Sequence, residues 1–309
     1  MSNFSLKNVA TRQGAPWLAP IPVLFVLLWS TGFIVAKFGL PYAPPLTFLL
    51  MRCTLVLVVL LPCVLIWKAP WPTGSIGHIA VAGLLLQAGY LGGVWCAIKL
   101  GMPAGVSALI VGMQPILTAA AAPLIGERVR PLQWLGLLFG LTGVAMVVYA
   151  KITLVGLAPA AIGFSVIALL SITAGTMYQK RFCPRFDLRT GTVIQFASTV
   201  AVLLPLAIVI EHLDPGLSTV SWTPRFIGAL LWSVLALSIG AIFLLFTLIR
   251  SSAATEVTSL LYLTPPTTAV MAWIMFGEAF SLLGVAGMLV AVVGVACVVK
   301  KKAIPLEIL

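Results

Sequence analysis

Apolar segments of about 20 residues follow one another along almost the whole chain, and a helix needs about that length to cross the hydrocarbon core of a bilayer. Hydrophobic residues make up 61% of the chain and charged residues only 8%, which is far from the composition of soluble domains. The sequence therefore predicts an all-α integral membrane protein with ten transmembrane helices. The segments are 18–37, 46–67, 77–98, 103–125, 131–150, 156–179, 191–210, 226–249, 253–276 and 281–299.

The basic residues indicate how these segments are oriented. If the N-terminus is cytoplasmic, the outer side carries Lys37, Lys99, Lys151 and Arg225, and Arg52 lies within the second segment. All the others of the 18 Lys and Arg residues then fall on the cytoplasmic side, as the positive-inside rule requires. We expect a multi-pass protein of the plasma (inner) membrane with both termini in the cytoplasm. The net charge of +11 then reflects topology, and no nucleic-acid partner is expected.

The two halves of the chain resemble each other in two ungapped alignments. In the first, which we call the C-terminal alignment, Lys99 matches Arg250, Pro115 matches Pro266, Gly126 and Glu127 match Gly277 and Glu278, and Gly143 matches Gly294. In the second, the N-terminal alignment, Gly32 matches Gly175 and Lys37 matches Lys180. Each half holds five helices, so the second must cross the membrane in the opposite sense. We expect two inverted repeats, residues 18–150 and 156–299, between a cytoplasmic N-terminal segment, 1–17, and a cytoplasmic tail, 300–309.

Inverted repeats are typical of secondary transporters, in which a site near the midplane is exposed to each side in turn. Two similar halves allow two states of similar energy, which alternating access requires. Proline breaks support this interpretation, because Pro115, Pro265 and Pro266 lie midway along the fourth and ninth segments. A broken helix frees carbonyl groups that survive in a bilayer only against protein or a water-filled cavity. The alternative is that these prolines are kinks that accommodate helix packing.

Polar and aromatic side chains near the breaks are the candidates for substrate binding, because they lie deeper than the interfacial belt. Trp29, Gln87, Gln114 and Tyr262 are the strongest of them. The alternative for each is hydrogen bonding between helices or plain packing. The full set is Trp29, Gln87, Tyr90, Trp95, Gln114, Tyr178, Tyr262 and Thr264, with Thr176 nearby.

Charged residues near the membrane are candidates for gating or charge recognition. Arg52 attracts an anionic group such as a carboxylate or extends to the outer interface, and Lys37 has the same two interpretations. Glu127 and Glu278 each follow a glycine at a helix end, where the carboxylate caps the next helix or pairs with basic residues in one transport state. Glu256 is the candidate proton carrier, with capping at the interface as its alternative.

Small residues form stripes on the fifth and tenth helices, and these stripes pack the two halves together or form a homodimer. Other motifs are missing from the sequence. No phosphate-binding loop, no HExxH helix or His-rich metal cluster, and no convincing pair of nucleophile and base occurs, so we expect no cofactor, no metal and no enzymatic activity.

In its order of motifs the chain resembles the ten-helix, EamA-type members of the drug/metabolite transporter superfamily. The motifs are "LLWSTGFIVAKFGLPYAPPLTFLLMR" at 27–52, "QP" and then "GE" in the first half, and "TPP" and then "GE" in the second. The resemblance implies an exporter of amino acids, other small metabolites or drugs, with helices five and ten apart from a central cavity. The motif residues it carries over are Trp29, Lys37, Arg52, Gln114, Pro115, Gly126, Glu127, Pro266, Gly277 and Glu278.

The second repeat departs from the first, with Ile172 in place of Trp29, Gln195 in place of Arg52 and Pro265 in place of Gln114, so substrate contacts are expected to be asymmetric. The function we expect is secondary active export by alternating access. An integral-membrane enzyme and a passive channel or scaffold are the alternatives. A small-molecule substrate and membrane lipid are the expected partners, and the sequence leaves open both a coupling proton and a homodimer.

Overall fold

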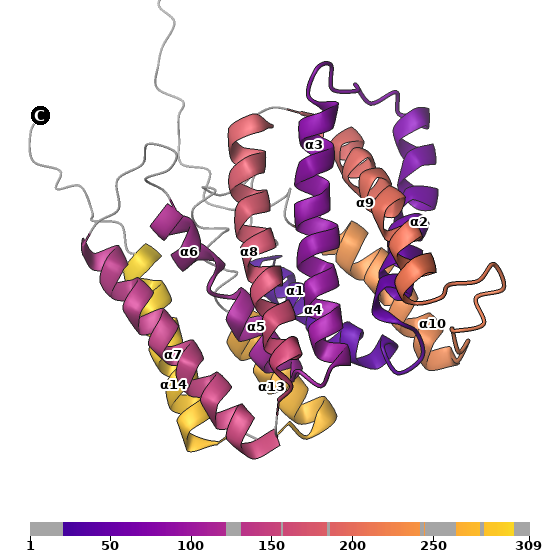
Figure 1. Cartoon of the computed structure of the whole chain (residues 1–309). Helices are drawn as coiled ribbons and strands as arrows, with labels where there is room; N and C mark the ends of the chain where they lie inside the picture. The colour runs from indigo at the N-terminus through magenta and orange to yellow at the C-terminus, as the bar shows by residue number, and fades with distance from the viewer. Residues whose placement is uncertain are drawn as a thin grey trace, which may run out of the picture.

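The computed structural model describes residues 21–121, 131–155, 157–183, 186–241, 244, 264–278 and 281–299, and within these ranges all regular secondary structure is helical (Figure 1). Five of these helices are long and apolar enough to cross a membrane, and shorter apolar helices accompany them. The elements are α1 (Ile21–Gly39), α2 (Pro45–Ile66), α3 (Ile76–Gly83), η2 (Leu84–Gly89), α4 (Tyr90–Lys99), α5 (Ala104–Val111), α6 (Gln114–Ala121), α7 (Pro131–Val155), α8 (Pro159–Phe182), α9 (Leu188–Ile210), α10 (Pro224–Leu231), η4 (Trp232–Gly240), α13 (Thr264–Phe276) and α14 (Leu282–Val299).

Helix ends gather at two faces. At the first, which we call the Lys37 face, α1 ends beside the end of α13, because Lys37 Nζ lies 2.6 Å from Glu278 Oε1. At the second, the Asp187 face, the Asp187 side chain caps α9 by accepting a hydrogen bond from the backbone N–H of Arg189. Hydrogen bonds from Arg189 also lower the pKa of the Asp187 carboxyl. Helix ends that the sequence predicts on opposite sides of the membrane thus lie on opposite faces of the bundle.

The pair α7 and α14 shows how the two halves are related. The two helices pack side by side at one edge of the bundle (Figure 1). A methyl group added at Gly143 would lie 2.5 Å from the Gly287 carbonyl oxygen, and one added at Gly294 would lie 2.6 Å from that of Gly136. The two contacts are equivalent, because Gly143 corresponds to Gly294 and Gly136 to Gly287 in the C-terminal alignment. The helices therefore run antiparallel about a two-fold relation, as inverted repeats require, and the small-residue stripes pack the two halves within one chain.

The ends of α2 and α9 repeat this relation. At the Lys37 face Thr47 Oγ1, at the start of α2, donates to Glu211 Oε2 at 2.8 Å, just beyond the end of α9. At the Asp187 face Thr190 Oγ1, at the start of α9, donates to the Pro70 carbonyl oxygen at 2.9 Å, beyond the end of α2. Thr47 and Thr190 are equivalent in the N-terminal alignment, so matching contacts stand on opposite faces.

Two helices contain π-helical segments that the sequence analysis did not predict. Backbone N–H groups there bond one position further back than in an α-helix: Tyr90 N–H to the Leu85 carbonyl oxygen and Ala241 N–H to that of Ala236. In the C-terminal alignment η2 falls inside η4, so the feature is repeated as well. Such widened turns recur at functional sites because they displace side chains from the regular helical pattern.

The predicted break in the fourth segment is present. Helix α5 ends at Val111, a turn covers Gly112 and Met113, and α6 begins at Gln114, so Pro115 falls in the first helical turn, where a missing N–H costs little. In the second half the described part of α13 starts at Thr264, next to Pro265 and Pro266. The first part of the predicted ninth segment lies outside the described residues.

Candidate functional site

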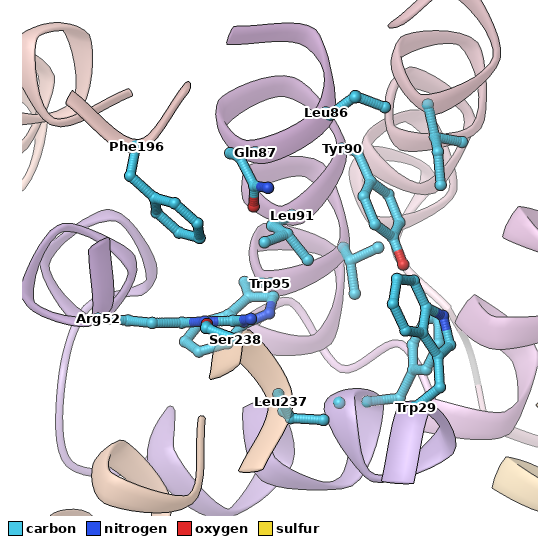
Figure 2. Close-up of a pocket in the computed structure, with 14 residues that line it drawn as sticks. Trp29, Arg52, Leu86, Gln87, Tyr90, Leu91, Trp95, Phe196, Leu237 and Ser238 are labelled. Atoms are coloured by element: carbon cyan, nitrogen blue, oxygen red, sulfur yellow. The ribbon is translucent and has the colours of Figure 1, made fainter. Parts of the chain in front are cut away.

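A cavity of about 190 Å³ lies in the middle of the bundle, between α1, α2, α4, α8, α9 and the two π-helical segments (Figure 2). Its walls are mainly aromatic and aliphatic, with a few polar groups that converge on it, which is the usual character of a small-molecule site. The cavity is smaller than the usual range of such sites and so fits a small ligand. The residues that line it are Trp29, Gly32, Phe33, Arg52, Leu86, Gln87, Tyr90, Leu91, Val94, Trp95, Ile172, Phe196, Leu237 and Ser238.

A second pocket of about 50 Å³ continues this space toward the break between α5 and α6 and toward Pro265 of α13. It shares a wall with the larger cavity, namely Trp29, Phe33, Tyr90 and Ile172. Its other side is formed by α5, α6 and α13 and includes Gln114, Thr264 and Pro265. The two pockets together form what we call the central site. The break between α5 and α6 therefore borders the central site, and so do Thr264 and Pro265 of α13.

Equivalent positions of the two halves meet in the central site. Trp29 and Ile172 correspond in the N-terminal alignment, and both line the two pockets. Gln87 and Ser238 correspond in the C-terminal alignment, on the two π-helical segments, and both line the larger cavity. All lining residues come from elements other than α7 and α14, in agreement with the expected position of helices five and ten.

Arg52 reaches the central site from α2. Its side chain is only 7% exposed, and its Nε donates a hydrogen bond of 3.1 Å to Ser238 Oγ of the other half. Figure 2 shows the side chain extending from α2 toward Ser238 and the middle of the cavity. A side chain that extended to the interface would be exposed, so the structure places the charge inside the bundle.

Polar groups also converge on the smaller pocket. Gln114 Nε2 donates to Thr176 Oγ1 at 2.9 Å, which is the hydrogen bond between helices that the sequence analysis weighed against ligand contact. Thr264 Oγ1 is buried and has no hydrogen-bond partner among the described residues. A buried hydroxyl without a partner is costly, because water no longer solvates it. This pocket therefore has a polar group available to a ligand.

The Lys37 face is closed above the central site. Glu278 Oε1 accepts hydrogen bonds from Lys37 Nζ at 2.6 Å and from the Ala104 N–H at 3.1 Å. The N-terminus capped by this carboxylate is that of α5, in the other half, rather than that of the next helix in the chain. Gly277, with φ of +63°, ends α13 in the left-handed conformation that glycine tolerates. Glu278 thus pairs with a basic residue in this state, and the helix it caps is α5 of the other half instead of the next helix that the sequence predicted.

Three aromatic rings separate the cavity from the Lys37 face. Trp95 lines the cavity and lies edge-on to Phe48, with 4.5 Å between ring centroids, and Phe48 lies edge-on to Phe226 at 5.3 Å. All three side chains are almost completely buried. Beyond them a groove of about 500 Å³ is lined in part by Lys37, Lys99 and Arg225, and we call it the basic vestibule.

The other sequence candidates lie elsewhere. Tyr178 does not join the central site, because its hydroxyl is 2.8 Å from His78 Nδ1 near the Asp187 face. Tyr262, Glu127 and Glu256 lie outside the described residues. Within the described ranges no group of three or more His, Cys, Asp or Glu side chains could hold a metal ion.

Several residues at the central site and its closed face carry no local signal in the sequence that would predict their position. Phe196, Leu237 and Ser238 line the cavity, but they are ordinary residues of long apolar helices and carry no local signal. The repeat could have found Ser238, since it is the equivalent of Gln87. Glu211 holds the start of α2 by accepting from the Leu46 and Thr47 N–H groups at 2.8 and 2.7 Å. Its partner is too distant in sequence for a motif to reveal.

Comparisons with known proteins agree with this architecture. A model of the EamA-like transporter family matches residues 17–149 and 159–300. The uncharacterized transporter YvbV of Bacillus subtilis is 30% identical over 90% of this chain and 89% of its own length. The uncharacterized inner membrane transporter YedA of Escherichia coli K12 is 28% identical over 87% of this chain and 86% of its own.

Two further similarities concern the name of a relative and the fold. A Salmonella typhimurium protein named "Probable amino-acid metabolite efflux pump" is 29% identical over 162 residues, 52% of this chain and 52% of its own. A solved crystal structure matches with a TM-score of 0.64 at 20% identity, over 92% of this chain and 96% of that chain. At that identity the likeness shows a shared fold.

Proposed function

The chain belongs to the EamA-like transporter family, and we propose that it is a secondary active exporter that carries a small amphipathic metabolite through the central site by alternating access. Two family repeats cover nearly the whole chain, which makes it a membrane transporter. The site itself supports the proposed route. Function resides in the site rather than in the fold, so the proposed route rests on the geometry of the central site.

The main observation is that the cavity lies where equivalent positions of the two halves meet. Trp29 and Ile172 both line it, and Gln87 and Ser238 border it from equivalent π-helical segments. In an inverted-repeat transporter the site at the repeat interface stays fixed while the halves rock around it. A cavity built by one half alone would not be exposed to each side in turn by that motion.

We further propose that the Lys37 face is the extracytoplasmic face and that Lys37 and Glu278 close it. The pair joins the ends of α1 and α13, and Lys37 Nζ also lies 4.4 Å from the centre of the Phe276 ring. The repeat assigns the same role at the other face to Lys180 and Glu127, the latter outside the described residues. Rocking would then exchange one pair for the other, with both termini in the cytoplasm.

The proposed direction, export from the cytoplasm across the plasma membrane, follows the name of the Salmonella typhimurium relative. We propose transport without an enzymatic step. The two stripes on α7 and α14 already face each other within the chain, so they are not available to a homodimer. A proton as the coupling ion remains part of the proposal, to be tested with an imposed pH gradient.

The test uses purified full-length protein in liposomes and a broad panel of small metabolites. We expect saturable uptake and counterflow of at least one compound, with loss of transport in Trp29→Ala at unchanged reconstitution. Lys68→Gln, on the Asp187 face and away from the site, is the control and should transport normally. Counterflow that never saturates would indicate a channel, and transport unaffected by Trp29→Ala would place the route elsewhere.

A further inference from the structure

Arg52 is a buried charge that lacks a carboxylate partner in the described part of the chain. The described acids are all engaged elsewhere. Asp187 bonds Arg189, Glu211 bonds the start of α2, Asp214 bonds Ser218, and Glu278 bonds Lys37. Within the same residues the hydrogen bond of Arg52 is the one from Nε to Ser238, and it leaves the terminal Nη1 and Nη2 groups without an acceptor.

An arginine in this position is costly, because a charge removed from water needs compensation. Its planar guanidinium presents N–H groups in a fixed fork that matches both oxygens of a carboxylate. Ser238 holds one edge of the fork, which fixes the orientation of the remaining N–H groups in the cavity. The side chain is therefore arranged as the anchor of an anion that arrives with the ligand.

The walls around Arg52 describe the rest of that ligand. Trp29, Phe33, Tyr90 and Ile172 form the wall shared by the two pockets, and they suit an apolar or aromatic body. At the far end Gln114 and Thr264 offer neutral hydrogen-bonding groups, including the Thr264 hydroxyl that has no partner in the described part of the chain. A carboxylate, an apolar body and a neutral polar end therefore match the central site in that order.

The charge of the site selects against cations. Among the described residues that line the two pockets, Arg52 is the charged one. A ligand ammonium would meet an uncompensated positive charge in a region of low dielectric constant, where repulsion is strong. The charge of the site thus favours an anion over a zwitterion and a zwitterion over a cation.

The basic vestibule is positively charged, as Arg52 is, and it supports the same inference independently. It lies beyond the Trp95, Phe48 and Phe226 rings, and it is lined by Lys99 and Arg225 together with Lys37, whose charge Glu278 compensates at 2.6 Å. A groove lined by one sign of charge raises the local concentration of the opposite ion. An anion released from Arg52 toward the Lys37 face would enter this groove.

We propose that the transported substrate is an organic monocarboxylate with an apolar body, held by Arg52 between Trp29 and Tyr90. The assignment rests on the function proposed above and goes beyond it by naming the chemical class. Amines and other organic cations are excluded as preferred substrates, and a zwitterionic amino acid is a weaker ligand than the corresponding acid without its amino group.

The test compares four compounds with the same phenylethyl body: 3-phenylpropanoate, its amide, L-phenylalanine and 2-phenylethylamine. Binding is measured as the rise in melting temperature of the purified full-length protein over a range of ligand concentrations. We expect 3-phenylpropanoate to bind best, the zwitterion more weakly, and the amide and the amine not measurably. Arg52→Gln, which installs the residue of the second repeat, should weaken binding of the acid by roughly 30-fold or more.

Controls separate a ligand anchor from a structural role. Arg52→Gln should melt at the same or a higher temperature than the parent chain without ligand, because it removes an unpaired charge. Arg52→Lys should keep part of the affinity, and Lys68→Gln, which removes an exposed charge at the Asp187 face, should keep all of it. A fall in the ligand-free melting temperature of Arg52→Gln together with unchanged affinity for the acid would overturn the proposal.

Other outcomes distinguish this inference from the transport function. If the amine or the amide binds best, and Trp29→Ala but not Arg52→Gln abolishes that binding, the central site remains the transport site and the anion assignment is wrong. If the acid does not bind while the liposome panel identifies a cation or zwitterion as substrate, the assignment is overturned as well. Failure of every compound in both assays would contradict the proposed function together with this inference.

Discussion

The α7–α14 contact and the central site are both built from equivalent positions of the two repeats, but the contact keeps small residues at these positions, whereas the central site changes its large aromatic and polar ones. In the contact, Gly136 and Gly143 correspond to Gly287 and Gly294. In the central site, Trp29 corresponds to Ile172 and Gln87 to Ser238. Leu86 and Leu237 also correspond and both line the cavity, so the two repeats differ there in their large aromatic and polar groups rather than at every position.

The difference has a physical reason. Where two backbones approach so closely that an added methyl would lie 2.5 Å from a backbone atom, the residues of both helices must be small. The two-fold relation imposes this requirement at both equivalent positions. A ligand has no such symmetry, since one end differs from the other. The first half supplies most of the large and charged groups of the central site, and the second supplies mainly aliphatic and small ones.

The largest expected effect breaks the symmetric contact. Gly143→Val places a branched side chain against the Ala291 backbone nitrogen and the Gly287 carbonyl oxygen, which cannot move aside as a side chain could. We expect destabilisation by roughly 3 kcal/mol or more, and the same from Gly294→Val. Melting temperature and the monodisperse fraction in detergent are the measurements.

Gly163→Val is the matched control, because a Cβ atom added to that glycine of α8 would meet no atom within 4 Å. It should express and melt like the parent chain. If Gly143→Val and Gly163→Val melted alike, the close approach of α7 and α14 would be refuted.

The second prediction tests the asymmetry of the central site. Trp29→Ala should reduce transport by at least about tenfold, equivalent to ~1.4 kcal/mol, because it removes the largest side chain of the wall that the two pockets share. Ile172→Ala, at the equivalent position, should reduce transport by only about threefold. Initial rates in liposomes, normalised to reconstituted protein, measure both. Equal losses would mean that the ligand uses the two halves alike.

The third prediction concerns the ends of α2 and α9. Glu211→Gln should destabilise the protein by about 1 kcal/mol, since one neutral oxygen replaces a carboxylate that accepts from two N–H groups at a helix start. The equivalent residue of the first repeat is Lys68, which is exposed, so Lys68→Gln should leave the melting temperature unchanged. Similar shifts in the two variants would show that the Glu211 contacts contribute little.

The smallest expected effect concerns the Lys37–Glu278 pair at the closed face. A double-mutant cycle of Lys37→Met and Glu278→Gln should give a coupling energy of about 0.5 to 1 kcal/mol, because the pair is only partly buried. The coupling should shrink as salt is raised. An impermeant thiol reagent applied from outside should label a single cysteine at position 87 faster in Glu278→Gln than in the parent. Unchanged labelling would argue against a gate at this pair.

Much of the fold could be predicted because it is written in local patterns. For the helix ends that the structure describes, apolar length predicted the bounds within a few residues, and the break before Gln114 follows from Pro115. The π-helical segments could not be predicted, because η2 and η4 are as apolar as the regular helices around them. Their extra residue per turn depends on how neighbouring helices pack against them.

The site was predicted in part, and the misses have a common cause. Trp29, Gln87, Tyr90, Trp95 and Gln114 were selected because large or polar groups are unusual at mid-depth, and all of them line the central site. Tyr178 met the same criterion but pairs with His78 near the Asp187 face. Depth along a helix can be counted in the sequence, whereas the direction in which a side chain points depends on the rotation of the helix within the bundle.

The sequence by itself determined that the chain spans a membrane, that it consists of two repeats, and that five helices per repeat force the second to be inverted. These conclusions need only hydrophobic length, periodic identity and parity. The tertiary structure decided that Arg52 faces Ser238 rather than the interface, that Glu278 caps α5, and that Glu211 holds α2. Each of these contacts joins one half of the chain to the other, and such partners come together only when the helices pack.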